Sequence, residues 1–161
     1  MAIPNFNDTQ YGLITGPFFY FFLGTCTLFA GVMASIYNRR FLLGFASICW
    51  AISSVGTAFV HTFASLSLCR MLLGVFESFS APTSFSLIKD YFPPENRSLA
   101  NSFFTGALFL GASLSSLCTI MIEQNGWRDT YLIVGLFGIF VGILFIAVVR
   151  EQQRGRFNPL K

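Results

Sequence analysis

The chain has 161 residues and a formal net charge of +3, and 54% of its residues are hydrophobic while only 11% are charged. Soluble domains carry about 25% charged residues, and a fold of this size has too little interior to bury so much apolar surface. The composition, with 21 phenylalanines and a mean hydropathy of +0.65, excludes an ordinary soluble domain and predicts an integral, multi-pass membrane protein.

Apolar segments follow one another along the chain, and each is long enough to cross a bilayer, which needs about 20 apolar residues. Pro17 and several glycines predict a kink in the first segment, and Pro93 and Pro94 end a helix between the third and fourth. The fold class is therefore predicted to be all-α, a bundle of about five membrane helices. The predicted spans are residues 11–35, 41–60, 63–88, 100–122 and 131–149.

Basic residues orient these spans, because loops rich in Lys and Arg stay on the cytoplasmic side. One side has only Arg128 and His61 as basic residues. The other side carries Arg39, Arg40, Lys89, Arg97, Arg150, Arg154, Arg156 and Lys161. We therefore predict a short non-cytoplasmic amino terminus (1–10), a transmembrane bundle (11–149) and a basic cytoplasmic tail (150–161).

Two charged residues interrupt the third span. Arg70 and Glu77 are two helical turns apart, so both point the same way, with Gly74 between them. Ionisable groups inside a membrane usually face a water-filled cavity or a partner. In a functional interpretation, Glu77 gains and loses a proton while Arg70 biases that equilibrium or holds an anionic headgroup. In a structural one, Arg70 snorkels to the interface and Glu77 anchors neighbouring helices.

The remaining polar and small residues have simpler interpretations. His61 lies at a helix end and is interpreted as a wetted interfacial residue. Gly138 and Gly142 form a GxxxG pattern that favours close helix packing. A polar series in the fourth span either lines a cavity or joins helices, and comprises Thr105, Ser113, Ser115, Ser116 and Thr119. Four single cysteines are interpreted as small buried hydrophobes: Cys26, Cys49, Cys69 and Cys118.

Motifs of soluble enzymes are absent from the sequence. It has no Gly-rich phosphate loop, no HExxH, no GxSxG and no nucleophile beside a base. It also lacks a basic stripe for nucleic acid. We therefore expect no enzyme activity, no catalytic residue, no cofactor, no metal and no nucleic-acid partner.

Several motifs together resemble a known family. In RMLLGVFESFSAPTSFSLIKDYFPPENR (70–97), the order Arg70, Gly74, Glu77, Pro82 and the loop from Asp90 to Arg97 resemble the fourth helix and following loop of major facilitator superfamily transporters. The stretch NGWRDTYLIVGLFGI (125–139) resembles the Gly-Trp-Arg entry to that family's sixth helix, carried here by Gly126, Trp127 and Arg128. IYNRR (36–40) resembles the end of its helix 2–3 loop signature. The Tyr-Asn-Arg form and Glu77 are similar to the Spinster-like lipid transporters.

The resemblance implies a helical bundle that corresponds to the amino-terminal half of such a transporter. The first span would match the family's second helix, so the family's first helix and its carboxyl-terminal half have no counterpart. In Spinster-like proteins an acidic residue on helix one works with the Arg and Glu of helix four in proton-linked transport. Arg70 and Glu77 match the latter two.

The loop signature departs from the family pattern. The family has Gly, three residues, Asp, Arg, two residues and a basic pair. Here Gly31, Arg39 and Arg40 are present, whereas Ser35 replaces the Asp and Ile36 the Arg. That Asp normally supports a gate between the two transporter halves, so the usual gate cannot form.

Two functions remain open from the sequence. The first is proton-linked transport of a small organic or lipid-like solute, possible only when further helices complete the site, because such transporters bind substrate between two halves. The alternative is a degenerate, non-transporting half retained as a structural subunit of a membrane complex. Both imply contact with membrane lipids and with another transmembrane protein or a second copy that supplies the missing helices. Neither identifies the membrane.

Overall fold

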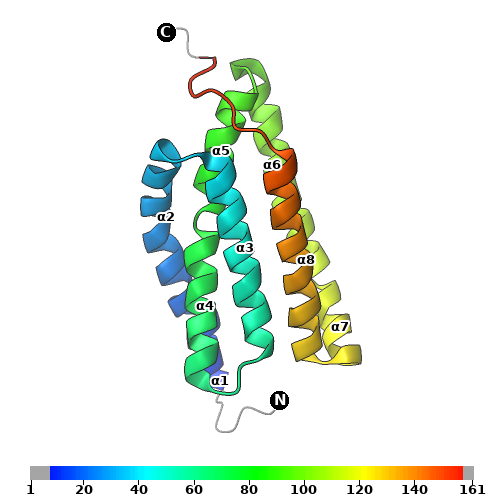
Figure 1. Ribbon diagram of the computed structural model, residues 1–161. Helices are drawn as coiled ribbons and strands as arrows, with labels where there is room; N and C mark the ends of the chain where they lie inside the picture. The colour runs from blue at the N-terminus through cyan, green and yellow to red at the C-terminus, as the bar shows by residue number, and fades with distance from the viewer. Residues whose placement is uncertain (1–7, 158–161) are drawn as a thin grey trace.

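The computed structural model describes residues 8–157, which form a helical bundle that contains no strand (Figure 1). This confirms the predicted all-α fold. The predicted amino terminus and basic tail fall partly on residues 1–7 and 158–161, which lie outside the described range. The elements are α1 (Asp8–Leu13), the π-helical turn η1 (Ile14–Phe18), α2 (Phe19–Ile36), α3 (Arg39–Ala58), α4 (Phe63–Glu77), α5 (Ser80–Tyr91), α6 (Pro94–Ser115), α7 (Leu117–Asn125) and α8 (Trp127–Val148).

Five helical stretches within the described residues are long and apolar enough to cross a membrane, as predicted. The fourth span begins at Pro94, earlier than the predicted residue 100. Proline suits the first turn of a helix, and Glu95 stabilises its positive end. The spans are Thr15–Ile36, Arg39–Ala58, Phe63–Tyr91, Pro94–Asn125 and Trp127–Val148.

The third span, predicted over 63–88 and found over Phe63–Tyr91, is interrupted between two helices. α4 ends at Glu77 and α5 begins at Ser80. Pro82 has no backbone N–H and cannot bond the carbonyl of Ser78 in the helical pattern, but it fits the first turn of a new helix. The break leaves Glu77 at the carboxyl end of α4.

Two other spans are irregular. Pro17, where a kink was predicted, lies inside the π-helical turn η1, a local widening that often bends a helix. The fourth span, predicted as one helix, is interrupted at Ser116, whose N–H bonds the carbonyl of Ser113 at 3.2 Å. α6 and α7 are therefore separate helices within that span.

α3 lies between α4 and α8 and packs most extensively against α8 (Figure 1). Small residues allow this close approach. A methyl group added at Gly142 would come within 2.7 Å of the Ile48 side chain, and one at Gly138 within 2.9 Å of Ala51. The glycines of the predicted GxxxG pattern therefore lie against α3 of the same chain.

α6 and α7 form the most exposed part of the bundle. Neither contains a buried residue, and α6 meets α5 and α7 only over short stretches. Phe103 and Phe109 are more than two-thirds exposed on α6, at 73% and 71%. In a bilayer, lipid chains or further helices must cover this apolar surface.

Candidate functional site: the cavity beside Arg70 and Glu77

The start of α4 is fixed by a capping box. The side chain of Thr62 accepts a hydrogen bond from the backbone N–H of Ser65 at 3.2 Å, and the hydroxyl of Ser65 accepts one from the backbone N–H of Thr62. This arrangement satisfies N–H groups that the first helical turn would otherwise leave unpaired. It places Arg70 in the middle of α4 and Glu77 at its end.

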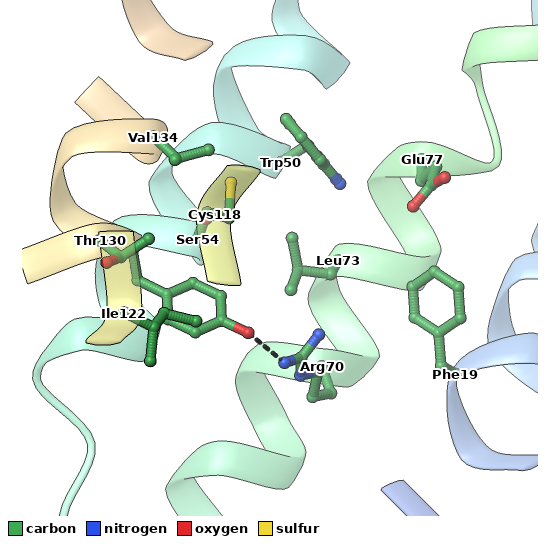
Figure 2. A pocket seen from close by; sticks show the side chains of 11 residues that line it. Phe19, Trp50, Ser54, Arg70, Leu73, Glu77, Cys118, Ile122, Thr130 and Val134 are labelled. Atoms are coloured by element: carbon green, nitrogen blue, oxygen red, sulfur yellow. Dashed lines mark hydrogen bonds between the residues drawn. The ribbon is translucent and has the colours of Figure 1, made fainter. Parts of the chain in front are cut away.

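Arg70 and Glu77 line one cavity of about 280 Å³ (Figure 2). α2, α3, α7 and α8 complete its wall. The lining residues are Phe19, Trp50, Ser54, Arg70, Leu73, Glu77, Cys118, Ile122, Thr130, Tyr131 and Val134. The two charged residues that were expected to share a face therefore do face a common space.

The guanidinium of Arg70 is held by a single side chain of α8. Its Nη2 donates to the hydroxyl of Tyr131 at 2.6 Å, the bond drawn as a dashed line in Figure 2. Its Cζ also lies 5.6 Å from the centroid of the Tyr131 ring, within the range of a cation–π contact. The Nε of Arg70 is buried and has no hydrogen-bond partner among the described residues.

Glu77 forms no ion pair with Arg70 or with any other basic group in residues 8–157. The indole of Trp50 points its nitrogen toward the Glu77 carboxyl (Figure 2) and is its polar neighbour. The Glu77 carboxyl can therefore exchange a proton without breaking a salt bridge.

A second cavity of about 540 Å³ adjoins the first. Trp50, Glu77 and Val134 line both, so these three residues lie where the two spaces meet. The second wall is mostly apolar and also includes Leu43, Ala46, Ser47, Phe76, Ser80, Ser84, Leu108, Phe137, Gly138, Val141, Gly142 and Phe145.

Other predicted residues lie away from this cavity. Gly74, expected on the face of Arg70 and Glu77, is instead buried against α2, where an added methyl would come within 2.8 Å of the Phe19 carbonyl. The contribution of Gly74 is therefore to the packing of α4 against α2.

The polar series predicted in the fourth span also lies away from this cavity. Thr105 lines a separate open hollow on α6 with Ser98, Asn101 and Ser102. Ser113 and Ser115 are exposed, and their hydroxyls bond carbonyls of their own helix.

The loop signature is built around Arg39, which is 2% exposed. Arg39 forms ion pairs with Asp90 at 2.5 Å and with Glu151 at 2.9 Å. Arg40 bonds the carbonyl of Ile146, and Arg97 donates to the carbonyl of Phe92 at 3.3 Å. This cluster joins the start of α3 to the end of α5 and to the segment after α8.

Two positions of the loop signature, Gly31 and Ser35, do not connect their helix to another one in this way. Gly31 is exposed, and an added methyl there would meet nothing within 4 Å. The hydroxyl of Ser35 bonds the carbonyl of Val32 in its own helix at 2.6 Å. Ser35 therefore does not reproduce the acidic group expected at this position of the family signature.

The Gly-Trp-Arg stretch shapes the turn into α8. Gly126 has a φ of 86°, a conformation that favours glycine. Arg128 lies over the Trp127 ring at 5.0 Å and donates to the Val60 carbonyl at 3.2 Å. It also lies 3.2 Å from Nδ1 of His61, so this histidine, interpreted as merely wetted, has a polar partner.

Trp50, Tyr131 and Glu151 were not predicted from the sequence. An indole N–H or a phenol hydroxyl in an apolar span requires a polar partner, and this signal could have marked Trp50 and Tyr131. Glu151, an acid in a basic tail, could have been matched to the arginines of the loop signature.

Comparisons with known proteins give consistent matches. The model of the Major Facilitator Superfamily matches residues 2–161. Over 155 residues the chain is 28% identical to human protein spinster homolog 1, and this alignment covers 94% of this chain and 29% of the human protein. It is 26% identical over 131 residues to a probable L-galactonate transporter of Escherichia coli K12 (81% and 29%). It is also 26% identical over 158 residues to the sphingosine-1-phosphate transporter SPNS2 of Xenopus tropicalis (96% and 31%).

The fold also matches a solved structure. A bacterial homologue of the human lysosomal transporter Spinster, in an inward-facing and occupied conformation, superposes with a TM-score of 0.79 at 26% identity. The match covers 97% of this chain and 39% of that chain. The chain thus spans about a third of the length of the proteins it resembles.

Proposed function

Since the chain belongs to the Major Facilitator Superfamily of transporters, we propose that it takes part in the proton-linked transport of a small organic or lipid-like solute. The active unit is the assembly in which these five spans are joined by further helices. Arg70 and Glu77 are its solute-binding and proton-coupling residues.

The observation that carries this proposal is the shared cavity of Arg70 and Glu77. Placing two ionisable groups inside a membrane is costly, and such residues usually serve a binding or proton pathway. Arg70 presents a fixed positive charge to the cavity, whereas Glu77 forms no ion pair with a basic group in the part of the chain that the structure describes. A solute anion and a proton can therefore be bound two helical turns apart.

The chemistry of the relatives supports an anionic solute. Galactonate and sphingosine-1-phosphate, named for two of them, both carry an acidic group that an arginine binds well. The second, apolar cavity of about 540 Å³ favours a solute with a hydrocarbon part. We therefore propose an anionic, lipid-like solute.

Further helices are needed on the α6–α8 side. α6 and α7 bury no residue of their own, and both cavities are open in the described bundle. We propose that a longer polypeptide, a second copy or another transmembrane protein covers this side. Membrane helices associate by close packing and polar contacts, which α6 offers through Asn101 and Thr105.

The alternative function is a structural membrane subunit that no longer transports. Ser35, bonded within its own helix, favours this alternative because it cannot form the charged gate of the family. In that case Glu77 would serve helix packing, and its replacement would not alter transport by the surrounding assembly.

Uptake of labelled galactonate and sphingosine-1-phosphate into vesicles, driven by an imposed pH gradient, tests the proposal. Glu77→Gln removes the titratable proton but keeps the shape of the side chain. We expect it to abolish gradient-driven uptake while membrane insertion and protein level stay the same. Glu95→Gln, a change at an exposed residue of the first turn of α6, is the matched control and should transport normally.

Two results would count against the proposal. Uptake by Glu77→Gln equal to the unmodified protein would remove the coupling role of Glu77. The structural-subunit alternative would be favoured if neither galactonate nor sphingosine-1-phosphate is taken up and if the complex that contains the chain stays intact in the Glu77→Gln variant.

A further inference from the structure

Arg70 has an unmet hydrogen-bond donor in the wall of the cavity. Its Nη2 is bonded to Tyr131, whereas its Nε is buried without a partner in the described part of the chain. A buried, unpaired donor is destabilising, and more so when the group is charged. The protein therefore leaves the guanidinium of Arg70, a residue that lines the cavity, incompletely paired.

Tyr131 supplies a second donor at the same place. Arginine can only donate, so the Tyr131 oxygen accepts in the 2.6 Å bond from Arg70. The hydroxyl proton of Tyr131 is then free to donate, and residues 8–157 offer it no acceptor in hydrogen-bonding contact. Since Tyr131 lines the same cavity as Arg70, both free donors belong to one site.

The Tyr131 ring is well positioned for this role. It contacts Trp127 edge-to-face with 6.4 Å between the ring centroids, and it lies beneath the Arg70 guanidinium. α4 and α8 lie on either side of α3 and each packs mainly against it (Figure 1). The Arg70–Tyr131 bond is therefore a direct link across the cavity between two helices that α3 otherwise separates.

We propose that Tyr131, which was not predicted as a site residue from the sequence, is an anion-binding residue that acts with Arg70. An oxygen of a carboxylate or phosphate accepts from the guanidinium of Arg70 and from the Tyr131 hydroxyl at once. Charge-assisted bonds of this kind are the stronger ones in proteins, and two donors from different helices fix the position of the anion. This inference rests on the proposed function, because it specifies the solute-binding part of that site.

The proposal is tested by calorimetric binding to the protein in lipid nanodiscs, purified with any tightly bound partner. The probes are hexadecyl phosphate, inorganic phosphate and galactonate, with hexadecanol as the uncharged analogue. Tyr131→Phe keeps the ring and removes only the hydroxyl. We expect it to weaken binding of the anionic probe by about tenfold or more, the cost of one bond to a charged group.

Two controls separate binding from folding. Hexadecanol binding should be the same for Tyr131→Phe and the unmodified protein, since a merely structural role would change both ligands together. Tyr20→Phe removes a hydroxyl from a tyrosine that is 66% exposed on α2, and should bind every probe normally. Arg70→Gln should abolish binding of the anion.

The outcomes distinguish this inference from the proposed function. If Arg70→Gln abolishes anion binding while Tyr131→Phe binds as the unmodified protein does, the role of Tyr131 is overturned and the proposed function is kept. If no anionic probe binds, the paired-donor site is overturned, whereas proton coupling is still judged by the Glu77 uptake assay. Binding of inorganic phosphate as tight as that of hexadecyl phosphate identifies a free anion rather than a lipid headgroup as the ligand and keeps the inference.

Discussion

Arg39 shows how a single residue stabilises one end of this bundle. Its guanidinium is almost fully buried and bonds Asp90, Glu151 and Ser86. Asp90 in turn accepts from the backbone N–H of Gly155 at 3.1 Å. One buried cation thus ties α3, α5 and the segment after α8 together.

Removing one partner of this buried pair should be costly. Asp90→Ala leaves Arg39 buried with an incomplete set of acceptors, and we expect a loss of about 3–5 kcal/mol in the free energy of unfolding. Glu151→Ala should cost less, because the Glu151 side chain is 23% exposed and its pairing is weakened by solvent. Unfolding by denaturant in mild detergent measures both.

Glu123→Ala is the control for these variants. Glu123 is exposed and forms no ion pair among the described residues, so its loss should be within about 0.5 kcal/mol of neutral. Equal effects of Asp90→Ala and Glu123→Ala would contradict the role given to Arg39.

Some residues of the cavity could be predicted from the sequence and others could not, for a physical reason. Arg70 and Glu77 were identifiable because charge is rare in an apolar span. Their neighbours Tyr131 and Trp50 carried only the weaker signal of a polar atom on an aromatic ring, because aromatic residues are common in this chain and only the packing of α3 and α8 brings these two to α4. Gly74 shared the spacing of the pair but faces α2.

At the scale of helices, the α3–α8 contact is the main packing of the chain. Gly135 lies close to the backbone of α3, where an added methyl would come within 2.9 Å of the Val55 nitrogen and 3.0 Å of the Ala51 carbonyl oxygen. Backbone atoms of a helix cannot move aside singly, so the two helices would have to separate.

We therefore expect Gly135→Val to destabilise the bundle by about 1–3 kcal/mol or more, the usual cost of overpacking. Gly111→Val on α6 is the matched control, because a methyl there meets nothing within 4 Å. Thermal unfolding of the two variants in the same detergent compares them. A Gly135→Val protein as stable as Gly111→Val would show that α3 and α8 are not so closely packed.

The sequence predicted the helices better than their interruptions. The apolar lengths identified all five spans. Pro82 was visible in the sequence, but whether a proline bends a membrane helix or divides it depends on how neighbouring helices satisfy the freed carbonyls. The break after Glu77 therefore emerged only from the structure.

At the scale of the whole molecule, the resemblance to Spinster-like major facilitator transporters is confirmed. The bundle is an integral, multi-pass membrane structure. Its orientation, with residues 150–161 on the cytoplasmic side, stays a prediction from the distribution of basic residues. The solute, the proton coupling and the partner helices are proposals, since relatives extend well beyond the part that this chain matches.

We propose that these five spans work only together with further helices that cover α6–α8. The native mass of the protein extracted gently from its own membrane, compared with its denatured mass, tests this most directly. We predict a particle that contains more helices than a 17.9 kDa chain provides, either in a longer polypeptide, in a second copy or in another membrane protein. A lone 17.9 kDa monomer that transports the probe would contradict the claim.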